Sequence, residues 1–254
     1  MKVLVRELLT LTFSMNKCMG VILINSKIME IFSSIQGEGL FIGKRQIFIR
    51  FAGCNIDCKY CDTENSKSGE IGDYISTDDL NDKVQSLLTP DFHSLEITGG
   101  EPLLYADFIR EFLLKYDYRV MLETNATLPD KLESLTGLVD IVSMDIKLPE
   151  HFNTKEEWLN VYENELKSIE VMERNNIRYY VKIVVSWMTP IRIIEDILQD
   201  LDGLVSSDVE FIVQPVSPMS LWKSKKNLFN ISEVIGKQYE VSIIPQIHKY
   251  MEID

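Results

Sequence analysis

The sequence lacks the cysteine content of a disulfide-stabilised protein. It has four cysteines in 254 residues, and Cys54, Cys58 and Cys61 fall within eight residues of one another. A framework of paired disulfides needs cysteines spread along the chain, so we expect this cluster to bind a metal centre instead. Reduced thiols are typical of the cytoplasm, which we predict as the location.

Long apolar runs are also missing. The patches Leu8–Phe13 and Met19–Ile24 are much shorter than the roughly 18 residues that a transmembrane helix needs. No cleavage site of the A-x-A kind follows them, so we predict neither a membrane helix nor a signal peptide.

Basic residues are outnumbered. The chain has 39 Asp and Glu against 26 Lys and Arg, for a formal charge of −13. Such a charge repels the phosphate backbone of nucleic acid over most of the surface. We therefore expect a small-molecule substrate and no nucleic-acid partner.

What the chain does contain is an alternation of short β-branched or aromatic runs with longer segments of helical period, which indicates an α/β fold. The predicted strands are Gln46–Ala52, Ser94–Thr98, Arg119–Glu123, Ile141–Asp145, Tyr179–Val185 and Glu210–Gln214, with a further short run at Val241–Ile244. Six βα units are too few for a closed eight-stranded barrel, so we predict a partial barrel with a mostly parallel sheet. Its site should lie at the carboxyl ends of the strands.

Helical periodicity predicts the covering elements. They are 77–88, 106–114, 191–201 and a long helix that starts with a capping box of Asn153 and Glu156. No repeat, low-complexity tract or linker marks a second domain.

The cysteine cluster has the pattern C-x3-C-x2-C and follows a predicted strand. Soft sulfur ligands at this spacing select zinc or an iron–sulfur cluster. A structural zinc ion wants four protein ligands, whereas a cubane on three cysteines leaves one iron open. Cys18 lies 36 residues before Cys54, and His93, His151 and His248 are distant in sequence. We favour a [4Fe–4S] cluster, with zinc as the alternative.

Two motifs together resemble the radical S-adenosylmethionine superfamily. They are the cysteine cluster and Thr98–Pro102, whose letters TGGEP match that superfamily's second signature. The resemblance implies a partial (βα)6 barrel. It also implies that the open iron is chelated by S-adenosylmethionine, whose amino group the GGEP backbone holds, and that a 5′-deoxyadenosyl radical is released.

Further segments resemble the 7-carboxy-7-deazaguanine synthase family: Ile35–Gly39, Phe48–Cys54, Cys61–Thr63, Leu122–Asn125 and Pro245–His248. The resemblance implies a lyase that converts 6-carboxy-5,6,7,8-tetrahydropterin to 7-carboxy-7-deazaguanine and ammonia, for queuosine or archaeosine. It further implies Mg²⁺, a reductant such as flavodoxin or ferredoxin, and a homodimer.

The same resemblance assigns roles to individual residues. The pterin would contact Ile35, Gln36, Gly37, Arg50 and Thr98. S-adenosylmethionine would contact Tyr60, Asp62, Gly100, Thr124, Ser143 and Lys147, and Thr63 would bind Mg²⁺. Strand ends add Glu123, Asp145 and Gln214 as candidates.

Simpler explanations exist for three of these assignments. Arg50 could be an exposed strand arginine, 36–39 an ordinary turn, and Thr63 a hydroxyl that caps a loop. Near Ser143 the chain also departs from the Ser-Pro-Lys form common in bacterial members.

The first 28 residues have no counterpart in the family pattern. We therefore treat 1–28 as an N-terminal extension and 29–254 as the radical S-adenosylmethionine domain, with Met29 as a candidate start. A chain beginning there is expected to fold and to load its cluster.

Two other functions compete. A glycyl-radical-activating enzyme shares the cysteine spacing, but Thr63 and the segment 36–39 argue against it. A non-catalytic iron–sulfur or zinc module would have no need for GGEP or for six strand-end loops.

Overall fold

The computed structural model describes residues 24–61, 64–67 and 69–253. The strands are β1 (Ser26–Ile35), β2 (Arg45–Phe51), β3 (Asp73–Ile75), β4 (Phe92–Gly99), β5 (Val120–Thr124), β6 (Ile141–Ile146), β7 (Tyr179–Val185), β8 (Phe211–Pro215) and β9 (Val241–Ile243). The α-helices are α2 (Glu64–Lys67), α3 (Thr77–Leu87), α4 (Ala106–Lys115), α5 (Pro129–Glu133), α6 (Lys155–Arg174), α7 (Ile191–Leu201), α8 (Lys226–Ile235) and α9 (Ile247–Met251). Short 3-10 turns are η1 (Gly39–Phe41), η2 (Pro102–Tyr105), η3 (Pro149–His151) and η4 (Met219–Leu221).

All strands of the described chain belong to one sheet, in the order β3-β1-β2-β4-β5-β6-β7-β8-β9. Each neighbouring pair from β2 to β9 is parallel, whereas β1 pairs antiparallel with both β2 and β3. The six predicted strands are confirmed, and the short seventh run forms β9. The sheet is thus the expected partial barrel of mostly parallel strands.

Strands β1 and β3 were not expected. In β1 the apolar Ile28, Ile31 and Ile35 are separated by polar and half-exposed residues, so no continuous β-branched run marks the strand. β3 has only three residues and lies at the edge of the sheet. Both strands depend on pairing with distant parts of the chain, which sequence periodicity does not register.

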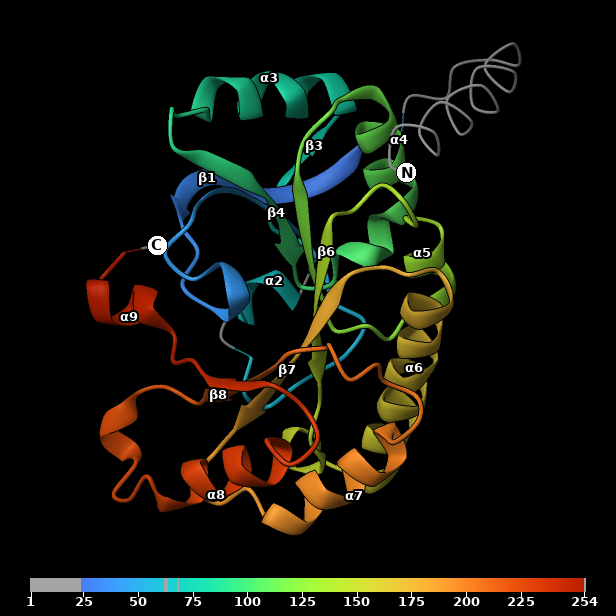
Figure 1. The fold of residues 1–254 in the computed structure, drawn as a ribbon. Coiled ribbons are helices and arrows are strands. Elements are labelled where there is room, and N and C mark those ends of the chain that lie inside the picture. Colours follow the sequence, from blue (N-terminus) through green and yellow to red (C-terminus); the bar gives the residue numbers. More distant parts are fainter. Residues whose placement is uncertain (1–23, 62–63, 68, 254) are drawn as a thin grey trace.

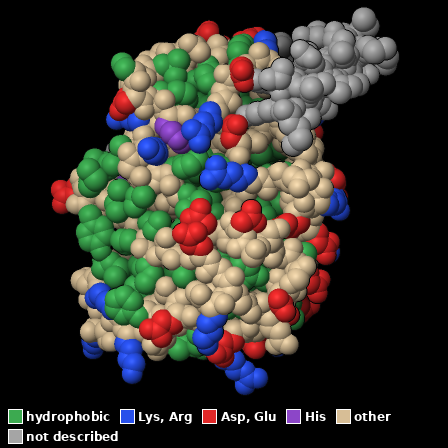
Figure 2. Space-filling model, viewed as in Figure 1, with side chains coloured by type: hydrophobic (Ala, Val, Ile, Leu, Met, Phe, Trp, Pro, Cys, Tyr) green, Lys and Arg blue, Asp and Glu red, His purple; other side chains and the backbone are tan. Residues whose placement is uncertain are grey.

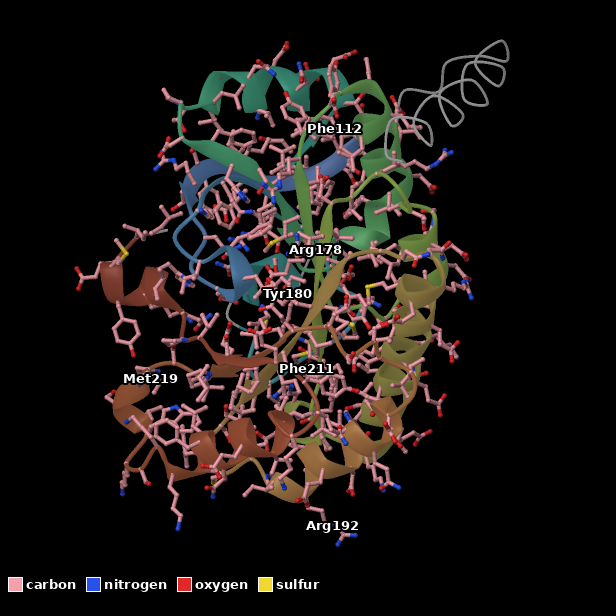
Figure 3. The ribbon with its side chains drawn as sticks, in the orientation of Figure 1. Phe112, Arg178, Tyr180, Arg192, Phe211 and Met219 are labelled. Carbon is pink, nitrogen blue, oxygen red and sulfur yellow. The ribbon has the colours of Figure 1, made fainter. Side chains whose placement is uncertain are left out.

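Side chains inside the barrel change from apolar to polar along the strands. A buried apolar cluster near the amino ends of the strands consists of Phe41, Met121, Ile141, Tyr180 and Ile212. Two residues further along the same strands lie Glu123, Ser143, Lys182 and Gln214. Side chains two residues apart on a strand point to the same face. Each of these strands therefore places an apolar side chain inside the barrel near its amino end and a polar side chain inside it nearer its carboxyl end. Figure 3 shows Tyr180 and Phe211 among the strands, with Arg192 at the outer edge.

The helices cover the outside of the sheet. Figure 1 shows α4, α5 and α6 along one side, with α7 and α8 beside them at one end. The main hydrophobic core lies between this layer and the strands. The predicted helices α3, α4 and α7 are confirmed to within one residue. Within the described ranges, no helix has both the length and the apolar character to cross a bilayer.

The capping box predicted at the start of α6 was placed one residue too early. The capping box is formed by Thr154 and Glu157 instead of Asn153 and Glu156. The Thr154 hydroxyl accepts a hydrogen bond of 3.2 Å from the Glu157 N–H, and the Glu157 carboxylate accepts one of 3.3 Å from the Thr154 N–H. The same carboxylate accepts the Asn153 N–H at 3.2 Å, so one acidic side chain serves two backbone donors.

Residues 26–28 make contacts that bear on the proposed domain boundary. They supply every pairing partner of β3, with Ser26 opposite Ile75 and Ile28 opposite Asp73. Ile28 is 4% exposed and belongs to the main core. The Lys27 carbonyl accepts a hydrogen bond of 3.1 Å from the Ala52 N–H, directly before the cysteine loop. Because of these contacts, we expect that removing residues 1–28 would lower the stability of the fold. The domain boundary between residues 28 and 29 stays a prediction.

We predict that a chain beginning at Met29 is less stable than one beginning at Ile24, by about 2–4 kcal/mol, because it loses a buried isoleucine and the pairing of β3. Urea unfolding of the two apoproteins measures the difference. The chain that begins at Ile24 is the matched control because it retains all of β1. Equal stabilities would show that residues 26–28 lie outside the folding unit.

Candidate active site

A cavity of about 1110 Å³ opens at the carboxyl ends of the parallel strands, where the sequence predicted the site. It is lined by most of the predicted site residues: Ile35, Gln36, Gly37, Arg50, Cys54, Cys58, Tyr60, Cys61, Thr98, Gly100, Thr124 and Lys147. Asp62 and Thr63, the predicted cofactor and Mg²⁺ contacts, lie outside the described residues. The candidates Glu123, Asp145 and Gln214 also line the cavity.

The three cysteines lie on the loop that follows β2. All three thiols are partly buried, and the Cys61 N–H donates a hydrogen bond of 3.3 Å to the Cys58 carbonyl. Lys67 Nζ holds the same carbonyl at 2.9 Å and pairs with Asp57 at 2.6 Å. Burial raises the pKa of Cys58 to about 11 against the opposing charge of Lys147. Binding of iron would displace the thiol protons of the cysteines, because the ligand is the thiolate.

Two glycines let the cysteine loop and the GGEP loop touch. A Cβ atom on Gly100 would lie 2.2 Å from the Gly53 carbonyl oxygen, and one on Gly99 would lie 2.3 Å from the Phe51 carbonyl oxygen. The backbones are joined by hydrogen bonds from the Gly100 N–H to Phe51 and from the Glu101 N–H to Gly53, at 3.2 and 2.9 Å. Any side chain at Gly100 would force the two loops apart.

Glu101, the acidic residue of GGEP, is fully buried and connects this loop to the end of β5. One carboxylate oxygen accepts hydrogen bonds from the Leu103 N–H at 2.9 Å and the Thr124 hydroxyl at 2.7 Å. The other accepts the Asn125 N–H at 2.8 Å. Burial raises the pKa of Glu101 to about 7, although these hydrogen bonds oppose the shift. The carboxylate thus fixes the loop that follows β5 relative to the loop that follows β4.

The donors present fit an iron–sulfur cluster. Three soft sulfur donors face one cavity beside a backbone cradle that only glycine can form. Among the described residues, no group of three His, Cys, Asp or Glu side chains is placed to hold a single metal ion. The three cysteines of a cubane each ligate a different iron, so their sulfurs need not meet at one point.

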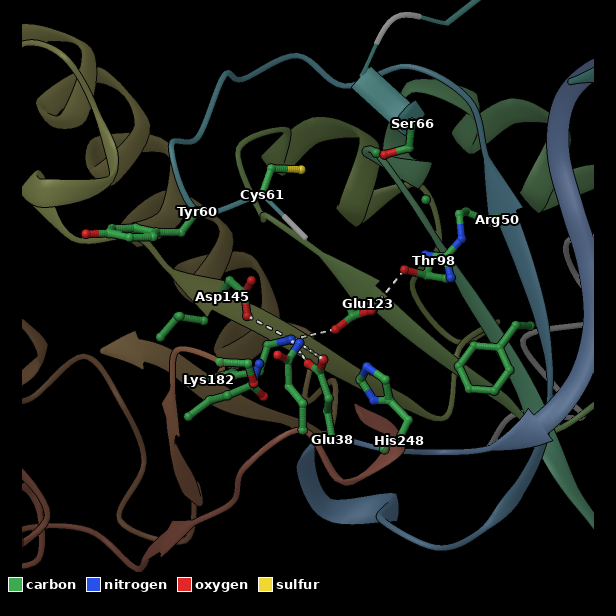
Figure 4. Close-up of a pocket in the computed structure, with 18 of the residues that line it drawn as sticks. Glu38, Arg50, Tyr60, Cys61, Ser66, Thr98, Glu123, Asp145, Lys182 and His248 are labelled. Atoms are coloured by element: carbon green, nitrogen blue, oxygen red, sulfur yellow. Dashed lines mark hydrogen bonds and ion pairs between the residues drawn. The ribbon is translucent and has the colours of Figure 1, made fainter. Parts of the chain in front are cut away.

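A second wall of the cavity is built around the buried ammonium of Lys182, in the middle of β7. Its Nζ atom lies 2.6 Å from Glu123, 2.9 Å from Glu38 and 3.3 Å from Asp145. Figure 4 shows these carboxylates converging on Lys182 from separate elements. Asp145 also pairs with Lys147 at 2.6 Å, and Thr98 donates a hydrogen bond of 2.9 Å to Glu123.

Mutual attraction keeps Glu38 and Lys182 ionised. Burial would raise the pKa of Glu38, but the charge of Lys182 and a hydrogen bond of 2.7 Å from Gln246 lower it to about 2. For the ammonium of Lys182 the signs are reversed: burial would lower its pKa, but the neighbouring carboxylates raise that pKa well above its ordinary value. The wall therefore presents fixed charges to a polar ligand at neutral pH.

Arg50 lies at the edge of this wall, on β2. Its Nε atom donates a hydrogen bond of 2.5 Å to Glu30, and its guanidinium carbon lies 5.9 Å from the centre of the Phe32 ring. Among the described residues, its two terminal nitrogens have no hydrogen-bonding partner. The side chain is thus held at one edge, with two donors directed elsewhere.

The segment 36–38 forms a fitted turn beside the carboxyl-terminal part of the chain. The Gln36 amide donates to Gln46 at 3.0 Å and accepts from the Glu38 N–H at 3.0 Å. A Cβ atom on Gly37 would lie 2.1 Å from Nδ1 of His248, so that this side chain can pack on the turn only because residue 37 is glycine. These contacts give the turn a defined shape.

Ser143 and Tyr60, both predicted to contact S-adenosylmethionine, are placed differently from the other predicted cofactor contacts. Ser143 is fully buried inside β6 and is not among the residues that line the cavity. Tyr60 is 45% exposed at its rim, with its ring against His151. Neither role is tested by this placement, and both stay predictions.

Lys182 and Asn125 were not predicted as site residues, although both line the cavity. A signal for Lys182 was present, because a single charge interrupts the apolar strand Tyr179–Val185. A charge buried in a strand needs partners, which makes such a position a candidate for a site. Asn125 ends the family-like segment Leu122–Asn125, but its contacts with Cys54 and Asn55 depend on the fold of the cysteine loop and could not be predicted from the sequence.

We predict that Lys182→Met lowers the free energy of unfolding by about 3–5 kcal/mol at pH 7, because buried carboxylates lose their partner. Without Lys182, burial should raise the pKa of Glu38 above its ordinary value of 4.5. A carboxyl group whose folded pKa is raised stabilises the protein below that range and loses this contribution as pH rises. The deficit relative to wild type should therefore shrink between pH 7 and pH 5, as measured by urea unfolding.

The control for this variant is Lys131→Met, which removes an exposed ion pair of 3.0 Å to Asp107. Exposed pairs contribute little, so this change should stay within about 0.5 kcal/mol at both pH values. A Lys182→Met deficit of equal size at pH 5 and pH 7 would show that lost packing, and not charge, is responsible.

Comparisons with known proteins agree with this geometry. Residues 48–204 match the family model described as the radical SAM superfamily. The chain is 40% identical over 242 residues to the 7-carboxy-7-deazaguanine synthase of Methanothermobacter thermautotrophicus, with 90% of this chain and 98% of that protein covered. It is 35% identical over 245 residues to the 7-carboxy-7-deazaguanine synthase of Geobacter sulfurreducens, covering 87% and 95%.

Two solved structures share the fold. The crystal structure of QueE from Escherichia coli has a TM-score of 0.57 and 22% identity, covering 86% of this chain and 93% of that one. SuiB from Streptococcus suis, bound to S-adenosylmethionine, has a TM-score of 0.54 and 15% identity, covering 82% and 54%. The sequence matches establish the family as well as the fold, because they extend over nearly the full length of the relatives. The chain belongs to the radical SAM superfamily and, within it, to the 7-carboxy-7-deazaguanine synthase family.

Proposed function

We propose that the chain converts 6-carboxy-5,6,7,8-tetrahydropterin to 7-carboxy-7-deazaguanine and ammonia within the single cavity at the carboxyl ends of its strands. The observation that carries this proposal is the pairing of two unlike walls. Cysteines and the GGEP loop form one wall, and a charged wall centred on Lys182 forms the other. The glycyl-radical-activating alternative has no support among the relatives, which carry the synthase name.

The cysteine wall would hold the cofactors. Cys54, Cys58 and Cys61 would ligate the [4Fe–4S] cluster, and the backbone at Gly100 would receive the methionine end of S-adenosylmethionine. When bound and reduced, the cluster supplies the electron that cleaves a carbon–sulfur bond of S-adenosylmethionine and releases a 5′-deoxyadenosyl radical. Thr124, held by Glu101, lies in the same half of the cavity.

The charged wall would hold the substrate. Arg50 would offer its two terminal nitrogens to the pterin carboxylate as a planar fork. Gln36 and Gly37 would contact the ring from the turn after β1, and Thr98 from the end of β4. Glu38 and Glu123 are both held in place by Lys182, so they can accept hydrogen bonds from ring N–H groups without reorganising.

A magnesium ion completes the proposal, with the Thr63 hydroxyl as its protein ligand. Thr63 lies outside the described residues and follows Cys61 by two positions in the sequence. Mg²⁺ takes few protein oxygens and completes its shell with water and substrate oxygens. A substrate carboxylate shared by Arg50 and Mg²⁺ would be held at two points while the ring reacts.

The cellular setting follows from the same chemistry. The three cysteines must stay reduced to bind iron, and thiols stay reduced in the cytoplasm, where flavodoxin or ferredoxin could supply the electron.

We also propose a homodimer. Figure 2 shows hydrophobic side chains gathered over η4 and α9, where Leu221, Tyr250 and Met251 are exposed. A second copy of the chain could cover them.

Two variants test the proposal through product mass spectrometry on anaerobically reconstituted protein. Arg50→Ala should raise the KM for the substrate by roughly ten- to a hundredfold, because it loses a charge-assisted contact to a group that does not react. Thr63→Ala should weaken the response to Mg²⁺ and slow turnover. Both variants should load the cluster and still cleave S-adenosylmethionine slowly.

The matched control is Arg192→Ala, an arginine that is 87% exposed and lies outside the cavity. Its KM should equal that of wild type. Absence of 7-carboxy-7-deazaguanine from wild-type reactions would contradict the proposed function, whereas an unchanged Mg²⁺ response in Thr63→Ala would contradict only the metal role.

A further inference from the structure

Asn125 follows β5 and reaches the cysteine loop. Its Nδ2 atom lies 3.8 Å from Sγ of Cys54 and donates a hydrogen bond of 3.0 Å to Oδ1 of Asn55. The side chain is 7% exposed and lines the cavity. None of the roles proposed above requires a buried amide beside this sulfur.

The amide of Asn125 has one favourable orientation in this network. Its Oδ1 atom accepts hydrogen bonds from the Thr127 N–H at 3.1 Å and the Thr127 hydroxyl at 2.7 Å. A rotated amide would place its NH₂ group against the backbone N–H, and two donors would then face each other. Nδ2 is therefore directed at Cys54 and Asn55.

The backbone that carries Asn125 is held in an uncommon conformation. The next residue, Ala126, has a φ of 55°, in the left-handed region that costs a residue with a Cβ roughly 1–2 kcal/mol. Three side chains hold the turn. Glu101 accepts the Asn125 N–H at 2.8 Å, Thr124 accepts the Ala126 N–H at 2.9 Å, and Ser168 donates to the Ala126 carbonyl at 2.6 Å. Strain of this kind persists only where the surroundings impose it.

We propose that Asn125 raises the reduction potential of the cluster by donating a hydrogen bond to the Cys54 thiolate. Reduction adds one electron from the external reductant, so the cluster changes from the 2+ to the 1+ state with no bond formed or broken. The added negative charge is shared with the ligating sulfurs. An N–H donor then stabilises the reduced form more than the oxidised form, and hydrogen bonds to sulfur are among the factors that set such potentials.

Asn125 is thus a positioning residue that acts through Cys54. The inference rests on the proposed [4Fe–4S] cluster. Glu101 links Asn125 to the GGEP loop, so the residue that tunes the cluster is tied to the loop that holds S-adenosylmethionine.

The test is a redox titration of the holoenzyme, followed by electron paramagnetic resonance of the reduced cluster. At the wild-type midpoint, Asn125→Leu should reduce the ratio of reduced to oxidised cluster roughly threefold to fivefold, the effect of one modest hydrogen bond. For a one-electron couple this corresponds to a midpoint about 30–40 mV more negative. An unchanged midpoint in this variant would overturn the inference.

A second pair of variants covers the case in which Asn125→Leu fails to fold. Asn125→Asp keeps the oxygen that accepts from Thr127 but replaces the donor that faces Cys54. Asn55→Asp adds the same charge beside Cys54 and leaves the Asn125 donor in place. Asn125→Asp should shift the midpoint further than Asn55→Asp, and equal shifts would overturn the inference. Failure of the wild-type protein to bind iron would contradict the proposed function instead.

Discussion

The close approach of two loops, at Gly53 and Gly100, is the contact on which the rest of the site depends. A Cβ atom at Gly100 would overlap the Gly53 carbonyl at 2.2 Å, so the contact exists only because a side chain is absent. The approach brings the cluster ligands beside the backbone that would hold S-adenosylmethionine. The buried carboxylate of Glu101 then extends the contact to a third loop, through Thr124 and Asn125.

The barrel supplies the second half of the arrangement by a simple alternation along its strands. Apolar side chains such as Tyr180 close the interior at one end, and polar side chains such as Lys182 follow two residues later at the other. The cost of burying an ammonium group is offset by carboxylates from several elements. One interior cavity is thus lined both by soft sulfur donors and by charged oxygen and nitrogen groups.

Much of this could be predicted from the sequence because the signals are local. Short apolar runs predicted the six parallel strands, and the spacing of Cys54 to Cys61 with the TGGEP segment predicted the residues of the cysteine wall. The remaining features depend on long-range pairing. Strand β1 is stabilised by its neighbours and has no clear apolar period, and the charged wall joins residues as distant as Glu38 and Lys182. Their proximity results from the closure of the barrel, which no local pattern encodes.

The proposed function requires that a hydrogen atom pass from a substrate bound beside Lys182 to the 5′-deoxyadenosyl group of a cofactor bound beside the cysteines, within one cavity. The most direct measurement uses substrate deuterated at its ring CH positions with unlabelled S-adenosylmethionine, and mass spectrometry of the 5′-deoxyadenosine that forms. We expect deuterium to appear in 5′-deoxyadenosine in step with product. Formation of 5′-deoxyadenosine without deuterium, at an equal rate with and without substrate, would contradict the arrangement.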